Sequence, residues 1–337
     1  MSSRIAVIIV NYGTAGLAIA AVDSVLSRDH DGHPVEVHLL DNASPGGDAA
    51  VLARAHSARN WGNRVRLWPE TRNHGFGRGN NVVLRALAAR PQPPDYVFLL
   101  NPDAQLQNEA LAILADRLDR TPQAAAAGAG IALPSGIPVT AAFRFPSARS
   151  EFAQAVNFGP LSRLFRDRLV PLPADQPEGP VDWVSGAAVM MRLSVLRDLG
   201  GFDPDFFLYY EEVELMFRMR KSGHQILYVP AARVRHVEGA ATDVKSGAPV
   251  RKRRPAYWYD SWRQYHLKTQ GRAGALAAGL AWLAGAGLNA PLALLRRQER
   301  RSPKRFFSDF TRLVIWPLLF GSRQGRRTGR VRDGEPG

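Results

Sequence analysis

The sequence of 337 residues contains no cysteine, so a disulfide framework, a thiolate metal site and a cysteine nucleophile are excluded. It also lacks a long hydrophobic run near its start, because only six apolar residues, at positions 5–10, follow Arg4. Such a run is too short for a signal-peptide core or a membrane span, so we expect a cytoplasmic protein. With 45% hydrophobic and 22% charged residues, the composition excludes a disordered, collagen-like or fibrous chain.

Acidic residues are scarce in the last third of the chain. Residues 1–232 contain 22 Lys and Arg against 23 Asp and Glu, whereas residues 233–337 contain 22 basic and only 7 acidic residues. The excess positive charge therefore lies entirely after residue 232. A basic segment on a neutral body indicates a polyanionic partner, either a nucleic acid or an anionic membrane surface.

Short β-rich runs alternate with helical patterns over the first hundred residues. We expect strands at 5–10, 35–40, 65–68 and 96–100, separated by helices at 17–26, 49–58 and 80–89. This alternation predicts βαβ units and a mostly parallel sheet flanked by helices, hence an α/β fold. Because ligands bind beyond the carboxyl ends of the strands in such sheets, the polar residues that follow each strand are the candidates for a site.

The second half of the chain changes character twice. Eight prolines from Pro134 to Pro180 predict a connecting region with one helix near 151–165. Further elements are expected in this order: strand 187–191, a helix from 194, helix 211–222 and strand 225–229. After His236 come an aromatic helix at 257–267, an uncharged stretch of 23 residues at 273–295 and a basic amphipathic segment at 304–320. Residues 321–337 are nearly all Gly, Arg and polar, which predicts a disordered tail.

The turn Asn101-Pro102-Asp103 directly follows an apolar strand. A carboxylate there would project from the ligand-binding edge of the sheet, and its hard oxygen atoms suit Mg²⁺ or Mn²⁺ bound to a nucleotide diphosphate. The alternative is an Asx-Pro turn without a ligand. His236 follows a later strand and either offers its imidazole to a metal or is structural.

Two other polar segments follow strands. The segment from Asp41 to Ser44 either forms hydrogen bonds with a ribose or base or caps the next helix. The segment 73–81 reads Asn-His-Gly-Phe-Gly-Arg-Gly-Asn-Asn and resembles a glycine-rich phosphate loop, with Arg78 as a charge partner. It has neither the Rossmann spacing nor the Walker lysine.

Three glutamates open the helix expected at 211–222. Acidic residues favour helix N-termini, and Glu214 can pair with Arg218 four residues later, which explains Glu211 and Glu214. Glu212 instead shares a helix face with two methionines. An acid held on an apolar face beside other carboxylates resists ionisation, so its proton affinity suits a general base.

Taken together, these motifs resemble family 2 glycosyltransferases of the rhamnosyltransferase type, over about residues 4–238. The segments that carry the resemblance occur in the family's order: Val10-Asn-Tyr12, Asp41-Asn-Ala-Ser44, Asn73-x-Gly-Phe76 with Gly79-Asn-Asn81, Leu100-Asn-Pro-Asp103, Trp183-x-x-Gly186, Gly200-Gly-Phe-Asp203, Phe207-x-Tyr-Tyr-Glu-Glu-Val-Glu-Leu215 and His236. The resemblance implies a GT-A fold, a nucleotide-sugar donor, a divalent metal (Mg²⁺ or Mn²⁺) and inversion at the anomeric carbon.

The resemblance also implies a role for each matching residue. The nucleoside would be bound by Asn11, Tyr12 and Asp41, and the rest of the donor by Asn73, Asn81, Asn101 and Asp103. The metal would be bound by Asp103 and His236, and the sugar and acceptor would be bordered by Trp183 and Gly186. The base that takes the acceptor proton would be Glu212, with Glu211 as the second candidate.

Three departures from the family pattern affect these roles. Gly13 stands where the family often has Asn, and Glu-Glu-Val-Glu at 211–214 replaces the usual Glu-Asp-Val-Asp. The longer side chains keep the chemistry but leave open which glutamate reaches the hydroxyl. The usual Asp-x-Asp is Asn-x-Asp here, so Asp103 alone supplies the carboxylate.

The domain organisation that we expect has three parts. Residues 1–240 form a GT-A catalytic domain, with a nucleotide-sugar half at 1–133 and an acceptor and catalytic half at 181–240. Residues 241–320 form a basic helical extension, which predicts attachment to an anionic membrane surface at the inner face of the cell membrane. The alternative is that these helices pack on the catalytic domain or form a dimer contact. Residues 321–337 form the tail.

The expected activity is transfer of a sugar, in the first place L-rhamnose from dTDP-rhamnose, to a glycan or lipid-linked acceptor of a bacterial surface polysaccharide. A nucleotidyltransferase is an alternative, but it would carry a glycine-rich loop with a basic residue after the first strand, where this chain has Asn11-Tyr-Gly-Thr14. A nucleic-acid-binding module is the other alternative. We expect no nucleic acid partner, because the basic region surrounds a long apolar stretch that nucleic acid would not need.

Overall fold

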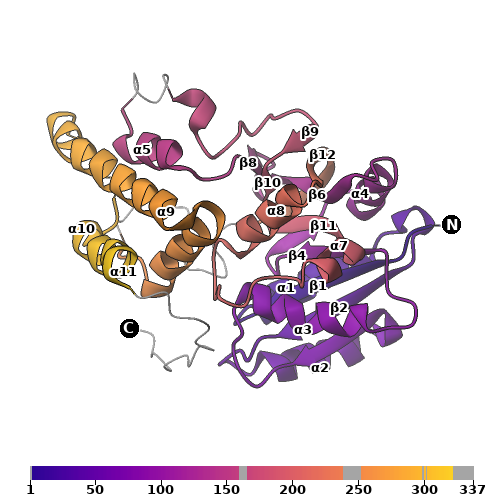
Figure 1. The fold of residues 1–337 in the computed structure, drawn as a ribbon. Helices are drawn as coiled ribbons and strands as arrows, with labels where there is room; N and C mark the ends of the chain where they lie inside the picture. The colour runs from indigo at the N-terminus through magenta and orange to yellow at the C-terminus, as the bar shows by residue number, and fades with distance from the viewer. Residues whose placement is uncertain (1, 159–164, 238–251, 298–299, 301, 322–337) are drawn as a thin grey trace. The chain divides into compact units, whose positions relative to one another are not determined.

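The computed structural model describes the chain except for residues 1, 159–164, 238–251, 298–299, 301 and 322–337 (Figure 1). The expected tail at 321–337 therefore lies, apart from Gly321, outside the described residues. The chain divides into two compact units. The first, Met1–Pro146 with Asp167–Val250, is called the sheet unit here, and the second, Ser147–Arg166 with Arg251–Gly337, the helical unit.

The first half of the sheet unit has the predicted βαβ order. Its four parallel strands are β1 (Ile5–Asn11), β2 (Val35–Asp41), β3 (Val65–Pro69) and β4 (Tyr96–Leu100). The helices between them are α1 (Ala15–Leu26), α2 (Asp48–Ala58) and α3 (Phe76–Ala88), with short 3-10 turns η1 (His30–Gly32) and η2 (Gly62–Arg64). The strands and the first two helices are confirmed, and α3 begins four residues before the predicted position.

The large sheet continues beyond β4 with strands of both directions, in the order β3-β2-β1-β4-β11-β6-β12-β5. The added strands are β11 (Ala188–Arg192), β6 (Ala124–Ala132), β12 (Gln225–His236) and β5 (Ala104–Leu106), with β7 (Pro138–Val139) and β9 (Gly179–Val181) beside β6 and β12. A separate two-stranded sheet pairs β8 (Ala142–Phe143) with β10 (Trp183–Val184). The remaining helices of this unit are α4 (Ala110–Asp119), α7 (Leu193–Asp198) and α8 (Glu211–Lys221). The fold is therefore mixed α/β, as expected.

Both faces of the sheet are buried. Alternate residues of β1 belong to two separate hydrophobic cores, with Ile5, Val7 and Ile9 in one and Ala6 and Ile8 in the other. This alternation follows from the two-residue repeat of a strand. Every residue of β4 is buried, which is why its sequence is almost wholly apolar.

Sequence analysis does not identify β6. Its sequence, AAAAGAGIA, is dominated by alanine and glycine, which are poor strand formers. In the structure β6 lies between β11 and β12, and a Cβ atom at Gly128 would lie 2.5 Å from the Cβ of Val184. Close packing against β10 therefore requires a residue without a side chain at this position of β6.

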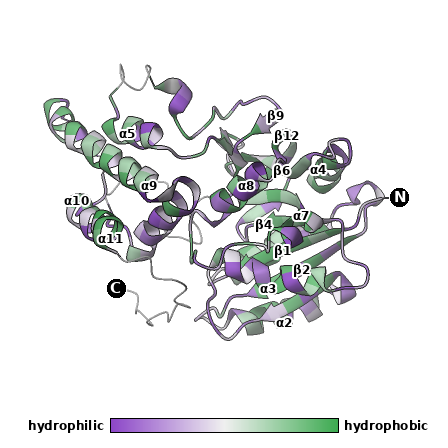
Figure 2. Cartoon of the chain, viewed as in Figure 1, coloured by the Kyte–Doolittle hydropathy of each residue, from purple (hydrophilic) through white to green (hydrophobic). Residues whose placement is uncertain are grey.

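The helical unit consists of α5 (Ala148–Val156), α9 (Ala256–Leu295), α10 (Phe306–Phe310), a π-helical turn (Thr311–Ile315) and α11 (Trp316–Phe320); the 3-10 turn η3 (Arg166–Arg168) lies at its boundary. Gly271, with φ of 71°, interrupts α9. The part of α9 after Gly271 is drawn mostly green and white in Figure 2, in accord with its Ala, Gly and Leu content. In the part of the chain that the structure describes, α9 alone is long and apolar enough to cross a membrane, by length and composition only.

Aromatic side chains form the centre of the helical unit. The ring centroids of Trp262 and Trp282 of α9 lie 5.1 and 5.0 Å from that of Phe310. Trp282 also contacts Phe306. Asn289 donates a hydrogen bond of 3.1 Å to the carbonyl of Val156 at the end of α5. Residues 147–156 thus pack with the C-terminal helices, although they lie inside the segment 1–240 that we expected to form the catalytic domain.

Candidate active site

Asn11 connects the ends of the first two strands. Its side chain is fully buried and donates to the Oδ1 of Asp41 at 3.0 Å and to the Oδ2 of Asp48 at 2.9 Å. Its own Oδ1 accepts from the backbone and the hydroxyl of Thr14. Because the amide is fully used within the protein, Asn11 orients Asp41, while its neighbour Tyr12 is 44% exposed and open to a ligand.

Asp48 is a site residue that sequence analysis does not identify. It begins α2, where an acid looks like an ordinary response to the helix dipole. In the structure its carboxylate is buried and accepts from the Asn11 amide and, at 2.9 Å, from the backbone of Ala15. It thus fixes the loop after β1 to the start of α2.

Asn42 holds the loop after β3 against the loop after β2. Its amide nitrogen donates to the Oδ1 of Asn73 at 3.0 Å and to the carbonyl of Gly75 at 3.1 Å, and its oxygen accepts from the backbone of His74 at 2.9 Å. The side-chain oxygen of Asn73 also accepts from the backbone of Gly75. Asn73 is therefore part of the loop's own hydrogen-bond network.

The glycines of the segment 73–81 allow two backbones to approach closely. Gly75 has φ of 73°, and a Cβ atom there would lie 1.8 Å from the carbonyl oxygen of Phe207. That carbonyl accepts a hydrogen bond of 3.2 Å from the backbone of Phe76, the first residue of α3. A Cβ atom at Gly77 would lie 3.0 Å from the Cβ of Phe202. The loop before α8 is thereby packed directly on α3.

The residues just before α8 are held from two further sides. From α3, Asn81 donates to the carbonyl of Phe202 at 2.7 Å and accepts from its backbone nitrogen at 2.9 Å. From α8, Arg218 donates to the carbonyls of Leu199 and Gly201, both at 2.8 Å. Glu214 accepts from the Nε of Arg218, which confirms the predicted i,i+4 pair and leaves Glu214 with a structural role.

Glu211 and Glu212 begin α8 after two residues in the left-handed region, Tyr209 with φ of 73° and Tyr210 with φ of 68°. Such φ values are strained for tyrosine, and strain of this kind gathers at functional sites. Glu211 is buried, whereas Glu212 is only partly buried. Each has one buried carboxylate oxygen for which the described residues offer no hydrogen-bond partner.

Burial raises the pKa of both carboxyl groups. For Glu211 the charge of Glu212 adds to the effect of burial, so that its pKa lies well above the usual value of 4.5. For Glu212 burial raises the pKa, and hydrogen bonds from backbone groups partly oppose the rise. Burial and a neighbouring charge thus both disfavour the ionised form of Glu211, and Glu212 is the more exposed of the two glutamates.

Gly186 lies directly beside Glu212. A Cβ atom at Gly186 would lie 3.5 Å from the Cβ and Cγ of Glu212 and 3.6 Å from the Cε1 of Phe76. Trp183, three residues earlier, stacks on Phe143 with ring centroids 4.0 Å apart and an angle of 13° between the rings. The structure thus brings one of the two predicted acceptor-side residues, Gly186, next to the predicted base.

Asp103 and His236 come together from distant parts of the sequence. The end of β12 pairs with β5, which places His236 opposite Ala104 in the antiparallel register. The Oδ1 of Asp103 lies 2.9 Å from the Nε2 of His236, and the amide of Asn101 lies 3.4 Å from the same nitrogen. The two residues that the sequence assigns to the metal therefore form one cluster with Asn101, which it assigns to the donor.

This cluster suits a metal that is held only partly by protein. Among the described residues no group of three or more His, Cys, Asp or Glu side chains could hold a metal ion. Asp103 and His236 supply two ligand groups, a hard oxygen and an imidazole nitrogen. Mg²⁺ is commonly bound in this way, with one or two carboxylates and the remaining ligands from substrate phosphates and water. The residues present therefore fit Mg²⁺ or Mn²⁺ bound together with a diphosphate.

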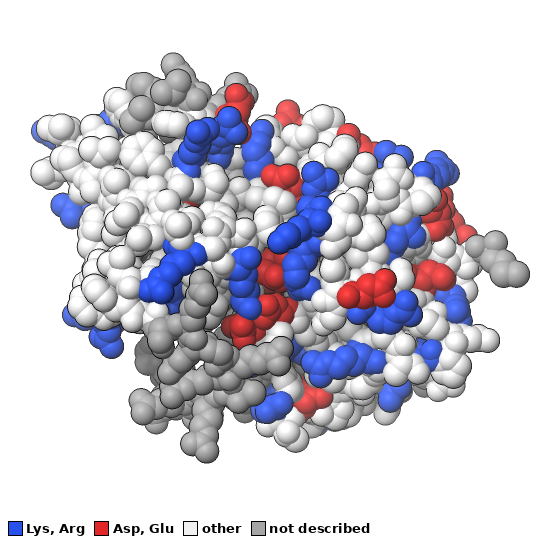
Figure 3. All heavy atoms as spheres, in the orientation of Figure 1, with Lys and Arg blue, Asp and Glu red and all other residues white. Residues whose placement is uncertain are grey.

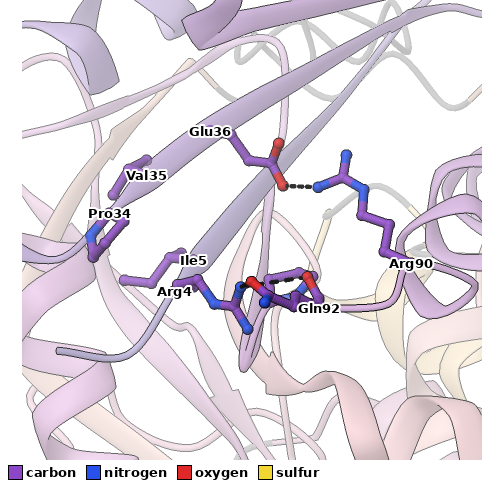
Figure 4. Close-up of a pocket in the computed structure, with 8 residues that line it drawn as sticks. Arg4, Ile5, Pro34, Val35, Glu36, Arg90 and Gln92 are labelled. Atoms are coloured by element: carbon purple, nitrogen blue, oxygen red, sulfur yellow. Dashed lines mark hydrogen bonds and ion pairs between the residues drawn. The ribbon is translucent and has the colours of Figure 1, made fainter. Parts of the chain in front are cut away.

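A pocket at the opposite edge of the sheet is separate from this site. It lies at the starts of β1 and β2, where Ile5, Val35 and Glu36 line it together with Arg90 (Figure 4). Although burial opposes the change, His38 and the hydrogen bond from Arg90 lower the pKa of Glu36 to about 2. The charges of Glu36 and Arg90 thus satisfy one another, and none of the candidate catalytic residues lines this pocket.

A family model described as glycosyltransferase-like family 2 matches residues 3–261. The chain belongs to this family. The match includes every candidate site residue and ends near the start of α9. This membership favours the glycosyltransferase prediction over the nucleotidyltransferase and nucleic-acid-binding alternatives.

Two relatives of this family 2 glycosyltransferase are named rhamnosyltransferases. The chain is 33% identical over 221 residues to the N-acetylglucosaminyl-diphospho-decaprenol L-rhamnosyltransferase of Mycobacterium tuberculosis, over 62% of this chain and 68% of the relative. It is 25% identical over 173 residues to the rhamnosyltransferase WbbL of Escherichia coli, over 48% of this chain and 61% of the relative. The predicted resemblance to rhamnosyltransferases of family 2 is confirmed.

Solved structures show the same fold. The mannosyltransferase PcManGT from Pyrobaculum calidifontis, in complex with GDP-Man and Mn²⁺, matches 95% of this chain and 88% of its own, with a TM-score of 0.54 and 17% identity. GalNAc-T7 with UDP, GalNAc and Mn²⁺ matches 94% of this chain and 58% of its own, with a TM-score of 0.59 and 13% identity. These similarities confirm the GT-A-like fold class.

Proposed function

We propose that this family 2 glycosyltransferase transfers L-rhamnose from dTDP-rhamnose to a glycan or lipid-linked acceptor in bacterial surface polysaccharide synthesis. The observation that carries the proposal is the place of Glu212. It is partly exposed, its Cβ and Cγ lie beside Gly186, and one of its carboxylate oxygens is buried with no hydrogen-bond partner among the described residues. A base at such a position is what an inverting transfer needs, because the acceptor hydroxyl must lose its proton as it attacks the anomeric carbon. The relative from M. tuberculosis supports rhamnose and a diphospholipid acceptor.

In the proposed reaction Glu212 accepts the proton of the acceptor hydroxyl as that oxygen forms its bond to the anomeric carbon. The bond from this carbon to the diphosphate breaks, and attack from the opposite side inverts its configuration. Because burial and the charge of Glu212 raise the pKa of Glu211, the pair is proposed to carry a single charge during the reaction. Burial keeps the pKa of Glu212 above 4.5 and thus makes it a stronger base than an exposed glutamate.

The donor end of the site is proposed to form around two groups. Asp41, oriented by Asn11, and the exposed ring of Tyr12 would bind the nucleoside, and Asn73 would border the donor within its loop. Asp103 and His236 would hold Mg²⁺ or Mn²⁺, which when bound supplies positive charge to the leaving diphosphate. Asn101 would keep His236 in place.

The helical unit is proposed to bind an anionic membrane surface at the inner face of the cell membrane. Several large apolar side chains of α9, α10 and α11 are exposed: Leu294 (75%), Leu295 (81%), Phe307 (43%), Trp316 (62%) and Phe320 (66%). In Figure 3 the face formed by these helices is largely white, with Lys and Arg around it. Basic side chains beside exposed aromatics are typical of helices that lie on anionic lipid, with about 1 kcal/mol gained for each Lys or Arg near the surface.

A donor screen tests the proposed function. Thermal unfolding is measured with dTDP-rhamnose, UDP-glucose, UDP-GlcNAc and GDP-mannose, each with Mn²⁺. The proposal expects the largest rise in Tm with dTDP-rhamnose, because a ligand that binds only the folded state stabilises it. A larger rise with a UDP- or GDP-sugar would reassign the donor.

A further inference from the structure

Arg78, in the first turn of α3, has a guanidinium group that is held through its Nε, while its two Nη groups remain available. It is partly buried, and its Nε donates to the carbonyl of His74 at 2.8 Å. Its guanidinium lies over the ring of Phe207, 5.6 Å from the ring centroid. Within the described part of the chain, its two Nη groups form no hydrogen bond and no ion pair. The Nε contact fixes the plane of the guanidinium while both Nη groups stay available.

The charges around Arg78 favour an anion. Burial lowers the pKa of Arg78, and the positive charge of Arg72 lowers it further, while Asp205 partly compensates. Among the described residues, these two cations and one anion leave a net positive charge at a half-buried position. A charge in such a place is costly unless an oppositely charged group joins it. A phosphate is a suitable partner, because an arginine fork binds two of its oxygens at once.

Arg78 is attached to the loop that leads to the proposed base. Phe207, under its guanidinium, precedes Glu211 by four residues, and the carbonyl of Phe207 is bonded to Phe76. Phe76 in turn lies against the same Gly186 position as Glu212. An anion bound at Arg78 would therefore lie beside the loop that leads to the proposed base, where the acceptor must approach.

We propose that Arg78 binds a phosphate group of the acceptor substrate. This inference rests on the proposed function, and it specifies the acceptor class as a sugar linked through phosphate or diphosphate to a lipid. The proposal also gives a role to the arginine in the glycine-rich segment. The glycines of this segment allow close backbone packing, and the group that binds phosphate is the side chain of Arg78. The diphosphate of the donor is a separate ligand, bound at Asp103.

A binding experiment separates the two phosphate sources. Geranyl diphosphate is titrated into the full-length protein in Mn²⁺ with saturating dTDP, so that the donor site is already filled, and geraniol is the neutral control. The wild type binds geranyl diphosphate more tightly than geraniol, and Arg78→Gln weakens that binding by about tenfold or more, the range for one lost charged hydrogen bond. Arg78→Lys retains part of the affinity, and Arg85→Gln, an exposed arginine on the same helix, retains all of it.

Three results would overturn the inference. One is a wild type that does not distinguish geranyl diphosphate from geraniol, and another is an Arg78→Gln variant that binds it as tightly as the wild type. The third is an Arg78→Gln variant that loses dTDP affinity to the same degree, which would place the guanidinium at the donor diphosphate. Unchanged dTDP affinity also shows that the variant is folded. Because no sugar transfer is measured, a wrong donor sugar changes none of these outcomes.

Discussion

The amide of Asn81 forms two hydrogen bonds with the backbone of a single residue, Phe202, at 2.7 and 2.9 Å. The pair is 121 positions apart in sequence, and it joins α3 to the start of the segment that ends at Glu211 and Glu212. A Cβ atom at Gly201 would lie 2.5 Å from the Oδ1 of Asn81, so glycine is required for this contact. Asn81, expected to border the donor, thus also holds the segment that leads to Glu212, the proposed base.

Asn81→Ala should lower both stability and turnover. It leaves the buried N–H and C=O of Phe202 unpaired, which costs about 1–3 kcal/mol. Because the segment before α8 is then less firmly held, kcat should fall while the affinity for dTDP changes little. Chemical unfolding and steady-state kinetics check this, with Ser57→Ala on the exposed face of α2 as the control. An Asn81→Ala enzyme with unchanged kcat would show that the contact does not position the base.

Glu212→Gln should remove the base while keeping the shape of the side chain. We expect kcat to fall by roughly 10² or more with little change in donor affinity. Since burial raises the pKa of Glu212, the wild-type rate should rise with pH through a pKa above 4.5, as the carboxylate forms. Glu211→Gln is the matched variant, and it should keep more activity. The opposite ranking of the two variants would assign the base to Glu211.

Glu211→Gln should stabilise the protein at neutral and higher pH. The folded-state pKa of Glu211 lies above its ordinary value of 4.5, so the folded state resists ionisation of this group. The free-energy cost of ionising Glu211 in the folded state is absent below pH 4.5 and grows as pH rises toward the folded-state pKa. Thermal unfolding should therefore show a Tm a few degrees above wild type at pH 8 and nearly equal values at pH 4.5. An equal or lower Tm at pH 8 would mean that the carboxyl is not penalised by burial.

The proposed membrane contact can be tested by sedimentation with vesicles. Full-length protein should sediment with phosphatidylcholine vesicles that contain phosphatidylglycerol, less so with pure phosphatidylcholine, and less at high salt. The double variant Trp316→Ser, Phe320→Ser should lose most of the binding. Ile137→Ser, which removes a 60% exposed apolar side chain from the sheet unit, is the control. Wild type that stays in the supernatant with both vesicle types would reject the contact.

The parts of the fold that the sequence predicts are those with a repeating apolar pattern. Strands β1 and β4 are almost wholly apolar, β2 and β3 are rich in Val and Leu, and the positions of all four are confirmed within a residue or two. Strand β6 has no such pattern, and at Gly128 close packing against Val184 leaves no room for a side chain. That requirement comes from a residue more than fifty positions later, so local sequence does not carry it.

The same limit applies to the candidate site. Asp103 is predicted as a site residue because it directly follows a strand, and the structure adds that His236 lies against it. The sequence does not show that Asn11 and Asn81, both predicted to bind the donor, also form hydrogen bonds that hold loops in place. Their partners come from other strands and loops, and a hydrogen bond across the fold leaves no local signal.

The most direct test of the account is a transfer assay with dTDP-rhamnose that follows release of dTDP in the presence of an N-acetylglucosaminyl-diphospholipid. Wild type with Mn²⁺ should release dTDP only when the acceptor is present, and the release should stop with EDTA. Asp103→Ala should lose most turnover while keeping the wild-type unfolding transition, because its carboxylate is proposed to hold the metal that offsets the charge of the leaving diphosphate. Near-normal rates for Asp103→Ala, or for wild type in EDTA, would contradict the account.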